Sequence, residues 1–489
     1  MKALMKWGCI CIYALGFAFC LFSCLSVRRA AIAMTLAAAG LLVAHVDCLR
    51  KSAGKLWKQF EERPRTALAA IFILGVIVRV CFALSLPEGG LWRIQNSDAR
   101  YFWGYAHEMA SGAFPDVKSW THTFLLSLSI RLFGNSLVPV VLTNTFLQFA
   151  TSFTLYMFAR KTFSQRAAIL SAATYLLAPS FIRLNFCALT ESCYFFLLSL
   201  AMLALSAWIR ERNAVALLVL PVLTWMTIWT RGEAVLLPML ALACLAADAF
   251  FADAAARCRA MLACAFFCCS CLIFAALGYA VNAHCHGTCT PMCSNDSWWP
   301  RLYGSNVASR GRVSGPRTGP QGANLVNDKI LMYEQYRKDH ANDPNKGVLK
   351  RRPMQCPKEL IPYIKAEIER RWKALSITEK INFVIIKEWL PWNNPYMGRG
   401  QHTDKKAMRT LYYDLMPAIA IALCAIGLFR RMVCTARSQY SSAMPLQCLP
   451  LLYLFGIVCA IAIAESNIRY GVIALLVCPL YAFPGSSKV

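Results

Sequence analysis

The sequence is poor in charged residues. Asp, Glu, Lys and Arg make up only 16% of its 489 residues, and 25 of these residues are acidic, whereas 58% of the chain is hydrophobic. A water-soluble protein could not cover so much apolar surface, so this scarcity excludes an ordinary soluble globular fold. The sequence also lacks an internal repeat, a low-complexity tract and a glycine-rich phosphate loop at a strand-to-helix junction. These absences argue against a repeat protein, a disordered chain and a nucleotide-binding enzyme.

About twelve apolar runs are long enough to cross roughly 30 Å of hydrocarbon. Because lipid offers no partner for a bare N–H or C=O group, each run should form a helix. We therefore expect an all-α fold, that of a polytopic integral membrane protein. The expected spans are residues 7–26, 30–47, 67–86, 137–159, 166–183, 192–209, 213–230, 234–251, 260–282, 411–429, 446–464 and 469–484.

Basic residues mark one side of this membrane protein. Counted along the expected spans, five groups of Lys and Arg fall on the same side, which the positive-inside rule makes cytoplasmic. They lie within residues 50–65, 160–166, 210–212, 257–259 and 430–437. Arg28 and Arg29 are the exception to this pattern. The formal net charge of +26 is better explained by anionic lipid head groups than by nucleic acid.

The chain divides into four parts. Residues 1–66 form an N-terminal transmembrane hairpin with a basic cytoplasmic loop, 67–282 a transmembrane core, 283–410 an extracytoplasmic cap, and 411–489 the C-terminal transmembrane helices. Within the cap, the polar composition of residues 304–345 predicts loop. The spacing of Ile361, Ile364, Ile368 and Trp372 predicts an amphipathic helix over 359–371, and a second helix is expected over 378–389.

A polar, aromatic segment at residues 96–114 separates two apolar stretches and contains Asp98. We expect Asp98 at the outer edge of a span, where a carboxylate is costly to hold and usually has a function. The residue alone leaves two interpretations open. It is either a general base or the N-cap of a helix that begins at Ala99.

Short motifs follow one another in a fixed order between residues 67 and 250. They are NSDA at 96–99, MASG at 109–112, RLFGNS at 131–136, ARKTF at 159–163, APS at 178–180, TES at 190–192, TRGEA at 230–234 and LLP at 236–238. This order resembles the GT-C superfamily of membrane glycosyltransferases that use lipid-linked sugars, particularly the protein O-mannosyltransferases and lipid A aminoarabinose transferases. Residues 465–479 are similar to that family's last external turn and span. Gly232 stands where the family often has proline, and residues 283–410 match nothing that we can name.

The resemblance implies that Asp98 is the base that takes a proton from the acceptor. It also implies that Glu191 holds the acceptor, binds a metal or pairs with an arginine. The alternative for Glu191 is structural, because an acidic residue at a helix N-terminus is stabilised by the helix dipole. Tyr101 and Tyr105, which follow Asp98, are expected to stack on a sugar.

Arginines near the outer half of the membrane are the expected ligands of a lipid phosphate, because a guanidinium group binds phosphate oxygens through forked hydrogen bonds. We single out Arg79, Arg231 and Arg469. Arg79 interrupts an apolar span, where an isolated arginine costs about 2.5–3.5 kcal/mol on insertion scales. Snorkelling of its side chain to the interface is the alternative explanation.

The sequence leaves the cofactor open. Some members of the resembled family depend on a divalent metal, yet no second acidic residue forms an Asp-x-Asp pattern with Asp98. His284, His286 and the cysteines at 285, 289 and 293 could ligate zinc. The closing ligand pair of a zinc finger is absent, so we expect a disulfide or free thiols there.

Together the resemblance and the residues predict a glycosyltransferase. It would move a sugar from a polyprenyl-phosphate donor to a lipid, polysaccharide or protein acceptor at the extracytoplasmic face of a bacterial inner membrane. The expected partners are this donor and membrane lipids, with no nucleic acid. Two alternatives are a transporter or flippase of lipid-linked sugars, which would tend to show repeated halves and broken helices, and a non-catalytic assembly subunit.

Overall fold

The structure is a computed structural model of the chain. It describes residues 2–23, 55, 58–86, 97–113, 115, 117, 119–286, 291, 299, 301–302, 305, 328–341, 357–384, 416–437, 443–463 and 472–482. Every regular element in these residues is helical, which confirms the predicted all-α class.

The helices of the bundle and of its N-terminal part are α1 (Lys2–Ser23), α4 (Pro64–Leu84), α6 (Ser97–Ala110), α7 (Trp120–Phe133), α8 (Val138–Thr162), α9 (Gln165–Leu177), α10 (Pro179–Leu184), α11 (Glu191–Glu211), α12 (Ala214–Thr230), η1 (Gly232–Val235), α13 (Leu236–Phe251) and α14 (Ala254–His286). The remaining helices are α16 (Asp328–Asp339), η2 (Lys358–Leu360), α17 (Ile361–Lys373), α20 (Met416–Arg437), α21 (Ala443–Ile463) and α22 (Val472–Tyr481).

Five helices among the described residues are long and apolar enough to cross a membrane. They are α4, α8, α11, the continuous helix Gly232–Phe251, and Ala256–His284 within α14. These helices confirm five of the predicted spans and make the chain an integral membrane protein. The total of about twelve stays a prediction, because the span expected at 30–47 lies outside the described residues.

The span predicted at 166–183 is wrong as a single helix. Here α9 ends at Leu177, Ala178 is extended (φ −70°, ψ 132°), and α10 starts anew at Pro179. Proline has no N–H to continue the ladder and forces the preceding residue out of the helical region. The break turns the chain within the bundle and begins the segment that leads to α11.

The centre of the bundle is α11, which packs between α8 and α12 and is mostly buried. Small hydroxyl side chains connect it to α8: Thr154 and Ser199 lie 2.6 Å apart, and Thr162 and Ser206 3.1 Å apart, between their oxygen atoms. In a membrane such small polar residues let helices approach closely and add interhelical hydrogen bonds. The N-terminal α1 packs along α20, and α22 packs on α9 and α20.

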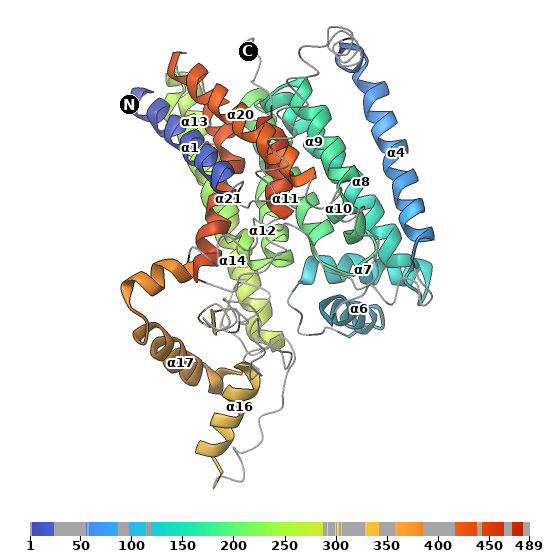
Figure 1. Cartoon of the computed structure of the whole chain (residues 1–489), viewed down its shortest axis with the longest axis vertical. Coiled ribbons are helices and arrows are strands. Elements are labelled where there is room, and N and C mark those ends of the chain that lie inside the picture. Colours follow the sequence, from blue (N-terminus) through green and yellow to red (C-terminus); the bar gives the residue numbers. More distant parts are fainter. Residues whose placement is uncertain are drawn as a thin grey trace.

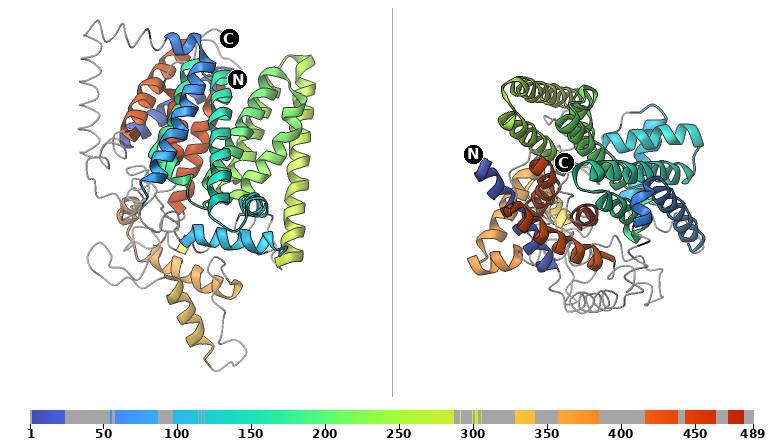
Figure 2. Two further views of the ribbon diagram at one scale, coloured as in Figure 1. Left: turned by 90° about the vertical axis from the view of Figure 1, so that its right-hand side faces the viewer. Right: turned by 90° about the horizontal axis from the view of Figure 1, so that it is seen from above.

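The two ends of the bundle differ (Figure 1, Figure 2). The amphipathic α6 and α7 lie across one end, with α16 and α17 beyond them, and both chain termini are at the opposite end. Ion pairs join helix ends on the terminal side: Lys161 Nζ lies 2.6 Å from Glu211 Oε1, and Arg212, the left-handed C-cap of α11, pairs with Asp248. Asp98, on α6, and the described cap helices therefore share one end of the bundle.

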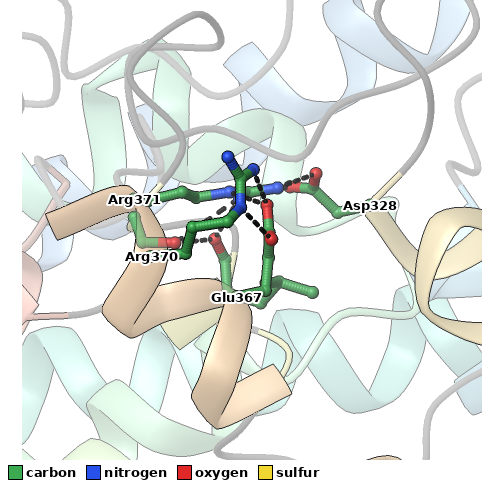
Figure 3. Close-up of polar contacts among 6 residues, drawn as sticks. Asp328, Glu367, Arg370 and Arg371 are labelled. Atoms are coloured by element: carbon green, nitrogen blue, oxygen red, sulfur yellow. Dashed lines mark hydrogen bonds and ion pairs between the residues drawn. The ribbon is translucent and has the colours of Figure 1, made fainter. Parts of the chain in front are cut away.

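The described part of the cap has its own small core. Its buried residues are Trp299, Leu302, Met332, Tyr333, Tyr336, Leu360 and Ile364. Arg371 crosses this core and binds Asp328 on α16 (Nη2–Oδ1, 2.8 Å) and Glu367 on α17 (Nε–Oε1, 2.8 Å; Figure 3). The ion pairs therefore hold α16 against α17.

The helix predicted over 359–371 is confirmed as η2 and α17. The loop predicted over 304–345 is wrong at α16, because Met332, Tyr333 and Tyr336 recur at helical spacing and bury against Trp299 and Leu302. A composition averaged over the whole segment conceals this local apolar face. A further helix covers residues 377–384 of the expected 378–389, and its remainder lies outside the described residues.

Candidate functional site

An ion cluster lies where α12 ends and α11 begins. Arg231 donates from Nη1 to Glu191 Oε1 at 2.8 Å and from Nε to Glu233 Oε1 at 2.5 Å. The Glu191 side chain is 2% exposed, whereas those of Arg231 and Glu233 are 15% and 21% exposed. The cluster therefore reaches from the bundle interior toward its surface, and a partly dry setting strengthens each charge interaction.

Local structure explains why these three residues meet. Glu191 is the first residue of α11, where the helix dipole stabilises a carboxylate. The helix α12 stops at Thr230, and Arg231 is extended (φ −149°, ψ 127°) before the short η1. This turn points the guanidinium group back at α11 and leaves Glu233 within reach of the same side chain. Of the three predicted roles for Glu191, pairing with an arginine is the one seen here.

Two tyrosines join the cluster to the C-terminal helices. The guanidinium carbon of Arg231 lies 5.5 Å from the centre of the Tyr194 ring, and the Tyr194 and Tyr453 hydroxyl groups are hydrogen-bonded to each other. Both tyrosines are fully buried. Sequence reasoning missed them, although Tyr194 follows Glu191 by three residues and so lies on the same side of α11.

The helix that carries Asp98 begins at Ser97, one residue earlier than the N-cap interpretation required. Asp98 is half-buried in the first turn, a position that the helix dipole also favours for a carboxylate. Tyr101 is 38% exposed and Tyr105 is half-buried. Their spacing of three and seven residues from Asp98 places all three on one side of α6.

Contacts run from α6 through α7 to the end of α12. The ring of Phe102 meets His122 on α7 edge-on at 5.9 Å, Thr121 Oγ1 donates to the Met226 carbonyl at 3.0 Å, and the rings of Trp120 and Trp229 lie 6.1 Å apart. The structure thus brings Glu191 and Arg231 into direct contact. It places Asp98 at the same end of the bundle through the packing of α6 on α7.

His122 is another residue that sequence reasoning missed. Its side chain is 1% exposed, and burial lowers the pKa of its imidazole to about 4. The imidazole is therefore neutral at neutral pH. Neither ring nitrogen has a hydrogen-bond partner among the described residues.

Arg79 is buried inside the bundle instead of reaching along α4 to the interface. It donates from Nη1 to the carbonyls of Gly75 and Leu176, both at 2.9 Å, from Nη2 to Gln148 Oε1 at 2.5 Å, and from Nε to Asn185 Oδ1 at 3.3 Å. These acceptors are neutral oxygens, and burial among backbone carbonyls is a common setting for an intramembrane arginine. The predicted phosphate contact of Arg79 stays a prediction, and a second role is argued below.

The remaining predicted site residues are constrained less. Arg469, like residues 287–290 and 292–298 of the His/Cys segment, lies outside the described residues. Among the residues that the structure describes, no group of three or more His, Cys, Asp or Glu side chains is placed to hold a metal ion. Glu191 and Glu233 could offer two carboxylates, but both bind Arg231. The described residues therefore do not fit a resident metal.

Comparison with known proteins gives one family. Residues 118–283 match the model of the family described as Dolichyl-phosphate-mannose-protein mannosyltransferase. The match runs from α7 to α14 and contains His122, Glu191 and Arg231, whereas Asp98 precedes it. No curated protein gives a match to the chain. The family match confirms the GT-C resemblance over these residues.

Two solved structures have related helix arrangements at low identity. One is the oligosaccharyltransferase AglB from Archaeoglobus fulgidus in complex with an inhibitory peptide and a dolichol-phosphate, with TM-score 0.47 and 12% identity over 86% of this chain and 50% of that chain. The other is ArnT from Cupriavidus metallidurans bound to undecaprenyl phosphate, with TM-score 0.36 and 14% identity over 82% of this chain and 77% of that chain. The chain thus spans half the length of the AglB chain that it matches.

Proposed function

We infer from the family match over residues 118–283 that this chain is a membrane glycosyltransferase of the GT-C superfamily, and we propose that it uses a polyprenyl-phosphate-linked sugar donor. The observation that carries the proposal is the Arg231 cluster, in which a guanidinium group lies between Glu191 and Glu233 inside the matched region. The acceptor would be a lipid, a polysaccharide or a protein.

In the proposed reaction an acceptor hydroxyl or amine attacks the anomeric carbon of the sugar. Asp98 takes the acceptor proton, a new glycosidic bond forms, and the bond to the lipid phosphate breaks with its electron pair leaving on the phosphate. Arg231 meets the negative charge that develops on this leaving group. Glu191 orients Arg231 and supports the acceptor, while Tyr101 and Tyr105 contact the sugar.

Arg79 and Arg469 complete the proposed set of phosphate contacts. Because Glu191 and Glu233 outnumber Arg231 in the cluster, further positive charge is needed to accept a lipid phosphate without repulsion. Arg469, which the sequence places at the last external turn, would supply it. No reaction step is assigned to a metal ion.

We place this site at the extracytoplasmic face of a bacterial inner membrane, under the cap formed by residues 283–410. The proposal is supported by the position of α6, α7, α16 and α17 at one end of the bundle (Figure 1). Cysteines introduced at Glu108 and Glu334, both exposed, should react with an impermeant maleimide added to intact cells. A cysteine at Arg257 should react only after permeabilisation, and the reverse pattern would reject the orientation.

The test of the function is mass spectrometry of glycolipids and glycoproteins from cells with and without the chain. We expect one sugar to disappear from its acceptor while the lipid-linked donor accumulates, and plasmid-borne parent to restore it. Arg231→Leu should fail to restore it, whereas Arg212→Leu, which breaks an ion pair at the opposite end of α11, should succeed. Restoration by Arg231→Leu would favour a non-catalytic assembly subunit.

A further inference from the structure

A set of amide side chains on α8 faces the segment that leads into α11. Asn144 is 1% exposed, and its Nδ2 donates to the carbonyls of Leu184, Asn185 and Cys187 at 3.2, 3.3 and 2.8 Å. These carbonyls belong to the end of α10 and the turn after it. They have no further helix to bond to, so the amide satisfies groups that would otherwise be unpaired inside the membrane.

Gln148 lies one helical turn along α8 and reaches the start of α11 itself. It is fully buried, and its Nε2 donates to the Phe181 carbonyl at 2.8 Å and to Ser192 Oγ at 3.2 Å. Ser192 is the neighbour of Glu191. The Gln148 amide therefore joins the first turn of α10 to the first turn of α11.

Arg79 fixes the orientation of this amide. Its Nη2 donates to Gln148 Oε1 at 2.5 Å, which leaves Nε2 pointing at Ser192 and Phe181, and its Nε donates to Asn185 Oδ1 at 3.3 Å. Thr145 Oγ1 donates to the same Asn185 oxygen at 3.1 Å. The positive charge of Arg79 is thus used to align two side-chain amides toward the chain before Glu191.

We infer that Arg79, Asn144 and Gln148 form a polar clamp that holds residues 181–192 and thereby positions the Glu191–Arg231 pair for the lipid phosphate. The inference rests on the proposed function for its second half. It makes Arg79, Asn144 and Gln148 positioning residues, since none of them contacts Arg231 in the printed contacts of the cluster.

Hydrogen exchange tests the clamp without using activity. The turns in residues 181–192 are closed by backbone bonds such as Asn185 N to the Phe181 carbonyl and Leu189 N to the Cys187 carbonyl. Asn144→Leu keeps the shape of the side chain but removes its three donated bonds, and it strands no charge. We expect amide exchange in 181–192 to accelerate by about tenfold or more in this variant in nanodiscs.

Thr154→Val is the matched control. Thr154 is a buried polar residue farther along α8, and it is hydrogen-bonded to Ser199 on the same helix α11. Its loss should weaken the α8–α11 contact without accelerating exchange in 181–192. Gln148→Met is a second test of the clamp, should Asn144→Leu fail to accumulate. Unchanged exchange in the clamp variants, or an equal increase in Thr154→Val, would overturn the inference.

Binding of undecaprenyl phosphate, measured by native mass spectrometry, tests the link to Arg231. We expect Arg231→Leu to weaken binding by about tenfold and Asn144→Leu by about fivefold, with the double variant no weaker than Arg231→Leu alone, because a clamp that acts through Arg231 has nothing left to position. Additive losses would show that the clamp acts elsewhere and would overturn the inference. If Arg231→Leu binds like the parent, the proposed phosphate contact fails, and the exchange result alone decides whether the clamp holds 181–192.

Discussion

Arg231 Nη1 lies 2.8 Å from Glu191 Oε1, a contact that joins the end of α12 to the start of α11. The same guanidinium group reaches Glu233, so one side chain holds two carboxylates from two elements. Only a planar fork with several N–H groups can do this in fixed directions, which an ammonium group on a flexible stem cannot. The arrangement therefore depends on arginine itself and not on positive charge alone.

Arg231→Lys should consequently lose function although it keeps the charge. We expect turnover to fall by about 10²-fold, as when one charge-stabilising donor is lost from an active site. The measurement is sugar transfer by the purified, correctly inserted variant. Arg212→Lys, which changes the Arg212–Asp248 pair at the other end of the bundle, should retain turnover within a few-fold of the parent. Equal losses in both variants would point to general destabilisation instead of a role at the site.

Gly232 is the position where the resembled family often has proline, and the structure indicates that proline fits. The preceding Arg231 is extended, as a residue before proline prefers, and an added Cβ at Gly232 would meet no atom within 4 Å. Gly232 also starts η1, where a missing N–H is tolerated. We expect Gly232→Pro to keep activity and to raise stability by about 0.4–1 kcal/mol, because it restricts the unfolded chain.

Thermal unfolding of the detergent-solubilised protein checks this expectation. Gly232→Val serves as the comparison, since it adds a side chain in the same open space without fixing the backbone angle. A proline variant that unfolds at a lower temperature than the parent would contradict the conformation described for Arg231 and Gly232.

The cap should loosen in acid. Arg370 and Arg371 hydrogen-bond to Glu367 and hold the pKa of its carboxyl below its ordinary value (Figure 3). A carboxylate whose pKa is lower in the folded state stabilises the fold above its unfolded pKa, about 4.3 for glutamate. That contribution is lost as the pH falls through the lower folded pKa. The packing of α16 on α17 should therefore weaken only below this range.

Hydroxyl-radical labelling of the buried Tyr333 and Tyr336, followed by mass spectrometry, measures this loosening. We expect labelling to rise between about pH 4 and pH 2 in the parent. In Glu367→Gln, which cannot ionise, the pH dependence should be smaller and labelling at neutral pH higher. A parent that loosens with the same midpoint as Glu367→Gln would assign the acid effect to other carboxyl groups.

The long apolar helices could be predicted from the sequence because each carries its own signal. The spans realised as α4, α8, α11, α13 and α14 are continuous runs whose length is fixed by the bilayer. The break between α9 and α10 was missed because hydropathy averages over Ala178 and Pro179, whereas proline acts on one residue. The helix α16 was missed because its apolar face is made by residues that only meet Trp299 and Leu302 after folding.

The site could be predicted in part for a similar reason. Glu191 and Arg231 were identifiable because charges at the ends of apolar runs are costly and therefore conspicuous. Their pairing was one of several alternatives, since nothing local joins residues that are 40 positions apart. The Tyr194–Tyr453 contact spans 259 positions, and Asn144 and Gln148 are single polar residues in an apolar helix. Such long-range partners have no periodic pattern in the sequence.

Asp98 is the residue whose role decides the mechanism. It combines the motif position of the resembled family's base with a half-buried place in the first turn of α6, beside Tyr101 and Tyr105. Asp98→Asn keeps the shape and the hydrogen-bonding capacity of the side chain but cannot accept a proton. A base therefore predicts a rate loss of about 10²–10⁴-fold with binding of undecaprenyl phosphate retained.

A structural role predicts a different result. Asn stabilises a helix start about as well as Asp, so a carboxylate that serves only α6 should be replaced with turnover within a few-fold of the parent. Glu108→Gln, an exposed change on the same helix, controls for the loss of a negative charge from α6 and should be silent. The two readouts, turnover and lipid phosphate binding, are taken from the same purified, correctly inserted preparations. Near-parental turnover of Asp98→Asn in them would remove Asp98 from the chemistry, and Glu191 would then be the next carboxylate to examine as the base.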